Sequence, residues 1–123
     1  MATILLVEDN PQNMKLADLV LRNAGHQVLQ AVDAYQALEL ARAHRPPLVL
    51  MDINLPGIDG LEAARRIRAD PLHAGIKIYA LTAYALPGDE ARMLAAGCDG
   101  YLCKPIHHKE LQRLVETALR SPN

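Results

Sequence analysis

Five polar residues with chemical potential each follow, directly or one residue on, a short apolar run of the chain: Glu8, Asp9, Asp52, Thr82 and Lys104. In an open α/β sheet, ligands bind beyond the carboxyl ends of the strands. If the apolar runs are parallel strands, these residues converge on one edge of a sheet. The sequence therefore predicts a site with three carboxylates, one hydroxyl and one amine.

Three carboxylates in one crevice repel one another. At about 5 Å and an effective dielectric constant of about 20, each pair costs roughly 3 kcal/mol, which we expect one lysine not to offset. A divalent cation would relieve the repulsion. Because the ligands are hard oxygens, the cation expected here is Mg²⁺.

A carboxylate beside Mg²⁺ can attack phosphorus, with the resulting phosphoryl oxygens held by the metal, an ammonium and a hydroxyl. Asp52 is the predicted nucleophile, and Lys104 and Thr82 are predicted to stabilise the phosphoryl group. Each residue alone also fits a structural role, because Asp and Thr often cap helices and Lys is usually solvated. Only their joint placement favours a site.

The elements that must position these residues alternate along the chain. Five apolar runs predict strands, at Thr3–Val7, Val28–Ala31, Leu48–Met51, Ile76–Leu81 and Tyr101–Cys103. Apolar residues at helical spacing lie between them and after the last, with predicted start or end signals at Pro11, Gly25, Asp33, Gly60, Pro87 and Gly97. Alternating strands and helices imply βαβ units and a parallel sheet with helices on both faces.

Length and composition predict one domain over residues 1–123, with a loose C-terminal tail at 119–123. The 13 Lys and Arg residues nearly balance the 14 Asp and Glu residues, without a block of like charge. With no Trp or Phe either, direct nucleic-acid binding is not expected. No basic leader or long apolar segment is present, so we expect a cytoplasmic protein without membrane insertion.

Two cysteines and two histidines lie near the C-terminus. Cys98 and Cys103, with His107 and His108 downstream, could be read as metal ligands. The favoured interpretation is that both cysteines are buried as small apolar residues and that the histidines belong to a solvated helix start.

Taken together, the motifs resemble the receiver domain of two-component response regulators, and similar motifs occur in single-domain regulators of cell division. The resemblance covers nearly the whole chain, and its motifs are Leu6-Val7-Glu8-Asp9-Asn10, Met51 to Gly60, Ala80-Leu81-Thr82-Ala83 and Lys104-Pro105. Several signatures in the right order are far more specific than one short motif.

The resemblance implies a flavodoxin-like (βα)5 fold with strand order 2-1-3-4-5. It implies that Asp52 accepts a phosphoryl group from a histidine kinase or phosphotransfer protein. Asp9, Asp52, Glu8 and the backbone carbonyl of Asn54 would hold Mg²⁺, and Lys104 would precede a cis peptide bond to Pro105.

The resemblance also implies a switch rather than an enzyme. Thr82 and Tyr101 would change position on phosphorylation and reshape the face of the fourth helix, fifth strand and fifth helix, where a downstream protein would bind. Asn54 and Tyr84 would flank the approach of the hydrolytic water. Neither is a carboxylate, and the Tyr84 ring is bulky enough to obstruct the water, so the phosphoryl group is expected to last minutes or longer. The alternative is that Tyr84 points outward and binds a partner.

Two other classes of function compete with this one. A Mg²⁺-dependent phosphohydrolase of the haloacid dehalogenase type also uses a strand-end Asp, but it carries an acid/base carboxylate where this chain has Asn54. Nucleotide or flavin binding on a similar fold would need a Gly-rich turn after the first strand, where this chain is acidic.

Overall fold

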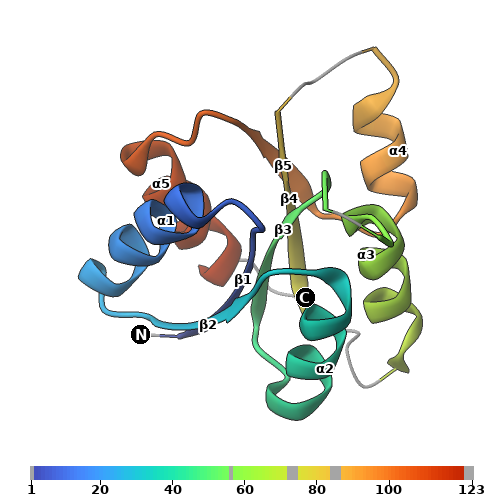
Figure 1. The fold of residues 1–123 in the computed structure, drawn as a ribbon, viewed down its shortest axis with the longest axis horizontal. Coiled ribbons are helices and arrows are strands. Elements are labelled where there is room, and N and C mark those ends of the chain that lie inside the picture. Colours follow the sequence, from blue (N-terminus) through green and yellow to red (C-terminus); the bar gives the residue numbers. More distant parts are fainter. Residues whose placement is uncertain (1, 56, 72–74, 84–86, 121–123) are drawn as a thin grey trace.

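Strands and helices alternate strictly in the computed structural model, which describes residues 2–55, 57–71, 75–83 and 87–120. Figure 1 shows their arrangement. The elements in chain order are β1 (Thr3–Val7), α1 (Pro11–Asn23), β2 (Gln27–Ala31), α2 (Ala34–His44), β3 (Leu48–Asp52), α3 (Gly60–Ala69), β4 (Lys77–Thr82), α4 (Asp89–Ala95), β5 (Gly100–Cys103) and α5 (His108–Arg120).

The five strands form one parallel sheet in the order β2-β1-β3-β4-β5. This confirms the predicted fold class, including the flavodoxin-like strand order. The central strand β3 is buried along its whole length, as expected for a parallel sheet covered on both faces. Because all strands point the same way, their carboxyl ends meet at one edge.

Each face of the sheet carries its own core. Alternate residues of β1 point to opposite faces, with Leu5 and Val7 in one cluster and Ile4 and Leu6 in the other. Helices α2, α3 and α4 cover the first face, and α1 and α5 cover the second (Figure 1). Helices packed on both faces thereby hold the sheet in place.

Several of the predicted helix signals lie at observed helix ends. Asn10 caps α1 by accepting hydrogen bonds from Gln12 N and Asn13 N, and Pro11 occupies the first turn. Asp33 caps α2 as predicted. Helix α4 begins at Asp89 rather than near Pro87, because Gly88 has a left-handed φ of 92° that a helix cannot include.

Two predictions about the C-terminal part were wrong. Cys98 is buried, but Cys103 is exposed because it ends the edge strand β5. Leu119 and Arg120 belong to α5 rather than to a tail, because Leu119 packs against the second core cluster. Among the described residues, no helix is long and apolar enough to cross a membrane.

Candidate functional site

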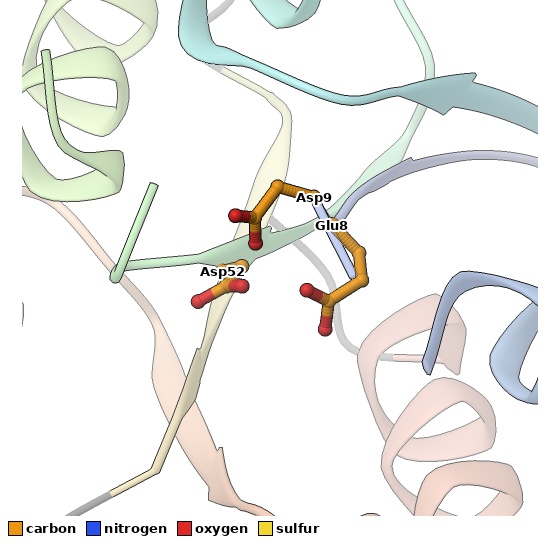
Figure 2. A group of neighbouring side chains, drawn as sticks. All are labelled: Glu8, Asp9 and Asp52. Carbon is orange, nitrogen blue, oxygen red and sulfur yellow. The ribbon is translucent and has the colours of Figure 1, made fainter. Parts of the chain in front are cut away.

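The predicted polar residues meet at the carboxyl edge of the sheet. Glu8 and Asp9 follow β1, Asp52 and Thr82 end β3 and β4, and Lys104 follows β5. Figure 2 shows the three carboxylates grouped where β1 and β3 lie side by side. The parallel register brings these residues together from distant parts of the sequence.

The carboxylates form a tight cluster that is buried on one side. Glu8, Asp9 and Asp52 each offer an oxygen within 4.8 Å of the others. Glu8 and Asp52 are 2% and 1% exposed, whereas Asp9 is exposed at the mouth. Solvent therefore reaches the cluster from the side of Asp9.

Lys104 lies between the two buried carboxylates. Its Nζ is 2.7 Å from Glu8 Oε1 and donates a hydrogen bond of 2.9 Å to Asp52 Oδ2. The backbone N–H of Lys104 donates to the Thr82 carbonyl at 2.7 Å, and the bond from Lys104 to Pro105 is cis. At these distances one lysine balances Glu8 and Asp52 better than the sequence led us to expect. Asp9 has no cation partner among the residues that the structure describes.

The electrostatic environment shifts the pKa values of the two buried carboxyls in opposite directions. Burial and a hydrogen bond shared with Asp52 raise the pKa of Glu8. Burial also acts to raise the pKa of Asp52, but hydrogen bonds with Glu8, Asn54 N–H and Lys104 outweigh burial and lower it. For Lys104, burial acts to lower the pKa, and its two carboxylate partners outweigh burial and raise it. Asp52 is therefore held as an anion beside a charged lysine.

Backbone groups fix the orientation of both buried carboxylates. The N–H of Asn54 donates to Asp52 Oδ1 at 2.9 Å, and the N–H of Asn10 donates to Glu8 Oε2 at 3.2 Å. The sequence analysis missed the contact from Asn10, whose only visible signal is its helix-capping type before Pro11. It used Gly60 only as a helix-start signal and assigned it no role at the site, although glycine is a poor residue for the first turn of a helix.

The donor set fits a divalent cation such as Mg²⁺. Glu8 Oε1 is buried and accepts no hydrogen bond within the described part of the chain, since its contact with Lys104 is an ion pair without hydrogen-bond geometry. Lys104 offsets the charge of this oxygen from 2.7 Å, and a divalent cation or its bound water could supply the partner that the oxygen lacks. The neighbouring oxygens belong to Asp9 and Asp52, an all-oxygen set that Mg²⁺ prefers.

The remaining predicted residues lie around this centre. Thr82 is buried at 2% exposure, and Tyr101 is half-buried against the first core cluster. Asn54 is exposed. Tyr84 lies outside the described residues.

Comparison with known proteins gives one consistent answer. The sequence model of the response regulator receiver domain matches residues 4–116. The polar-differentiation response regulator DivK of Brucella anthropi is 40% identical over 115 residues, which cover 94% of this chain and 91% of that protein.

Solved structures agree with this match. The receiver domain of the sensor histidine kinase PA1611 from Pseudomonas aeruginosa is 42% identical, covers 98% of both chains and has a TM-score of 0.90. That structure contains a magnesium ion coordinated in its active site cleft. The chemotaxis response regulator CheY4 of Vibrio cholerae is 27% identical, covers 96% of this chain and 98% of its own, and has a TM-score of 0.91.

Proposed function

This chain belongs to the response regulator receiver domain family, and from that premise we propose that Asp52 accepts a phosphoryl group from the phosphohistidine of a histidine kinase or phosphotransfer protein. The observation that carries the proposal is the state of Asp52. Its carboxylate has a lowered pKa, lies 2.9 Å from Lys104 Nζ and has two acidic neighbours. An ionised carboxylate in this setting can act as a nucleophile toward an electrophilic phosphorus.

The transfer forms a bond between an Asp52 oxygen and phosphorus while the bond from phosphorus to the donor's imidazole nitrogen breaks. The imidazole leaves with the electron pair. Lys104 remains charged, because its pKa is raised, and can exchange its contact with Asp52 for one with a phosphoryl oxygen. The hydroxyl of Thr82, on the neighbouring strand end, can donate to a second phosphoryl oxygen.

Mg²⁺ is the cofactor that these residues suit. Asp9, Asp52, Glu8 and the Asn54 carbonyl would hold it, with Glu8 acting directly or through a bound water. When bound, Mg²⁺ supplies positive charge that neutralises the carboxylates and the phosphoryl oxygens. The magnesium ion in the 42% identical receiver domain of PA1611 supports this assignment.

We infer that the output is a changed protein surface rather than catalytic turnover. Movement of Thr82 and Tyr101 would reshape the face of α4, β5 and α5, on which a downstream protein would bind. Leu94 of α4 is 53% exposed and offers an apolar contact on this helix. The two free cysteines suit a reducing compartment, which supports a cytoplasmic location.

The phosphoryl group is proposed to be long-lived. Asn54 and Tyr84 flank the water's approach in the family, neither supplies a carboxylate base, and the bulky ring of Tyr84 would obstruct the water. The same lack of a carboxylate at Asn54 weighs against the phosphohydrolase alternative. Phosphate release from the phosphorylated protein would measure the lifetime, and equal rates for wild type and Tyr84→Ala would remove Tyr84 from the explanation.

Intact-mass spectrometry after incubation with acetyl phosphate and Mg²⁺ tests the central claim. Wild type should gain one phosphoryl group, and Asp52→Asn should gain none because an amide oxygen is a poor nucleophile. Asp18→Asn is the matched control, because Asp18 pairs with Arg22 within α1 at 2.9 Å and does not belong to the acidic cluster; this variant should be phosphorylated like wild type. A full adduct on Asp52→Asn would place the acceptor elsewhere.

Partners can be identified with the same protein. Immobilised wild type, with and without beryllofluoride, should retain different proteins from a lysate. A protein that prefers the beryllofluoride form is a candidate for the downstream target. Identical sets of bound proteins would contradict a phosphorylation-controlled surface.

A further inference from the structure

The first residue of α3 lies against the backbone of the strand that carries Asp52. Gly60 is buried, and a methyl group placed on its Cα would overlap the Asp52 carbonyl oxygen. The same methyl group would lie 2.7 Å from Ile53 Cα and 2.9 Å from the Asp52 carbonyl carbon. All three neighbours are backbone atoms, which cannot rotate away as a side chain can.

Close approach, rather than backbone conformation, is what requires glycine here. The glycines with left-handed φ among the described residues are Gly25, Gly57, Gly88 and Gly97. Gly60 is not one of them, so its helical dihedral angles suit any residue. A side chain at this position is excluded only because α3 begins in contact with the peptide that joins Asp52 to Ile53.

That peptide is held from its other side as well. Ile53 N–H donates to the Leu81 carbonyl of β4 at 3.0 Å, and Asn54 N–H donates to Asp52 Oδ1 at 2.9 Å. The peptide is therefore confined between β4 and the start of α3. Any displacement of it is passed to the Asp52 carboxylate.

Helix α3 is held by packing and hydrogen bonds, so it cannot move away from the Asp52 backbone to make room for a methyl group at Gly60. Its buried side chains include Leu61 and Ile67, which lock it into the first core cluster. At its C-terminal end, Arg68 donates hydrogen bonds to the carbonyls of Gly97 and Ile76. Close-packed interiors transmit strain rather than absorb it, so an added methyl group would push on the Asp52 peptide.

We propose that Gly60 is a positioning residue for phosphoryl transfer, because its missing side chain lets α3 set the position of Asp52. The inference rests on the proposed function of Asp52. A carbon at 2.7 Å must move by about 1 Å to reach ordinary contact distance. Misplacement of a reacting group by about 1 Å can lower a rate by roughly 100-fold.

The test compares Gly60→Ala with Gly100→Ala. Gly100 is also tightly packed, but its methyl group would meet the ring of Tyr79, away from Asp52. For each variant we would measure the rate of phosphorylation by acetyl phosphate, the Mg²⁺ dissociation constant by calorimetry, and the midpoint of thermal unfolding. Both variants should be less stable than wild type, but only Gly60→Ala should lose about 100-fold in rate and also bind Mg²⁺ more weakly.

The outcomes separate this inference from the proposed function. A wild type that is not phosphorylated at Asp52 would remove the proposed function itself. A phosphorylated wild type with equal rates for Gly60→Ala and Gly100→Ala, measured where both are folded, would remove the role of Gly60 alone.

A second pair of variants covers the case in which Gly60→Ala does not fold. Leu61→Ala and Ile67→Ala each delete a buried side chain of α3, the first beside Gly60 and the second near the far end of the helix. If α3 positions Asp52 at its start, Leu61→Ala should slow phosphorylation by several-fold more than Ile67→Ala. Equal rates for this pair would overturn the inference.

Discussion

Replacing Lys104 with Met would leave two buried carboxylates without their cation. Lys104 Nζ lies 2.7 Å from Glu8 Oε1 and 2.9 Å from Asp52 Oδ2, and its side chain is only 16% exposed. At an effective dielectric constant of about 20, each contact corresponds to roughly 6 kcal/mol of Coulomb attraction. Methionine keeps most of the side-chain volume, so the change mainly removes charge.

Proton uptake limits the cost of this change. Without Lys104, Glu8 can take up a proton and leave Asp52 as the single anion of the buried pair. Keeping a carboxyl of ordinary pKa 4.5 protonated at pH 7 costs about 3.4 kcal/mol, at about 1.36 kcal/mol for each pH unit. We therefore expect Lys104→Met to lower the free energy of unfolding by about 3 kcal/mol at pH 7 without metal, in line with the loss of one partner of a buried ion pair.

The sign of the pH dependence follows from Glu8. A carboxyl whose pKa is raised in the folded state stabilises the fold fully below its unfolded pKa and loses that contribution as pH rises. The pKa of Glu8 is already raised by burial and by Asp52, and removing Lys104 removes a contact that lowers it. The variant should therefore recover stability as pH falls from 7 toward 5, by up to about 1.36 kcal/mol for each unit.

Urea unfolding followed by circular dichroism at pH 5, 6 and 7 measures these effects, with EDTA or with Mg²⁺. Mg²⁺ should stabilise Lys104→Met more than wild type, because the metal no longer competes with an ammonium for the carboxylates. Adding Glu8→Gln should recover much of the loss, and Lys109→Met, on the exposed side of α5, is the control. An equal loss at pH 5 and pH 7, with no recovery from Glu8→Gln, would refute the electrostatic reasoning.

Four further predictions concern Asp9, Arg68 and the two cysteines. Asp9→Asn should raise the metal-free free energy of unfolding by no more than about 1 kcal/mol, because Asp9 is exposed, and should shrink the rise in melting temperature caused by Mg²⁺. Arg68→Ala should lower the free energy of unfolding in urea by about 2 to 4 kcal/mol, because it removes hydrogen bonds to two backbone carbonyls and an ion pair of 2.9 Å to Asp99; a loss under 1 kcal/mol would contradict this. Burial raises the pKa of the Cys98 thiol from 9.0 to about 11, so this thiol should make stability fall as pH rises through this interval, by up to about 1.36 kcal/mol per unit. Cys98→Ala should make the slope shallower by that contribution, and an unchanged slope would contradict the prediction. In the folded protein a thiol reagent should modify Cys103 quickly and Cys98 slowly, and equal rates would disprove the difference in burial.

Much of the fold was predictable because each element carries its own signal. The apolar runs placed the strands within about a residue of their observed ends, and Asn10, Pro11 and Asp33 lie where the first two helices begin. Such signals involve only residues that are close together in the sequence, so they can be recognised without the tertiary structure. The site was predictable for a related reason, since the polar residue after each strand must lie at the same sheet edge when the strands are parallel.

The sequence by itself thus determined the alternating elements, the parallel sheet and the kinds of side chain that meet at its edge. Tertiary structure alone decided how they meet. Cys98 and Cys103 are alike in sequence, yet one is buried and the other exposed, because only the second ends an edge strand. Lys104 bridges Glu8 and Asp52 because the strand order and register bring the ends of β1, β3 and β5 within the reach of one side chain. The contact of Gly60 with the Asp52 backbone depends on where the core locks α3, a packing constraint between distant segments that no local pattern encodes.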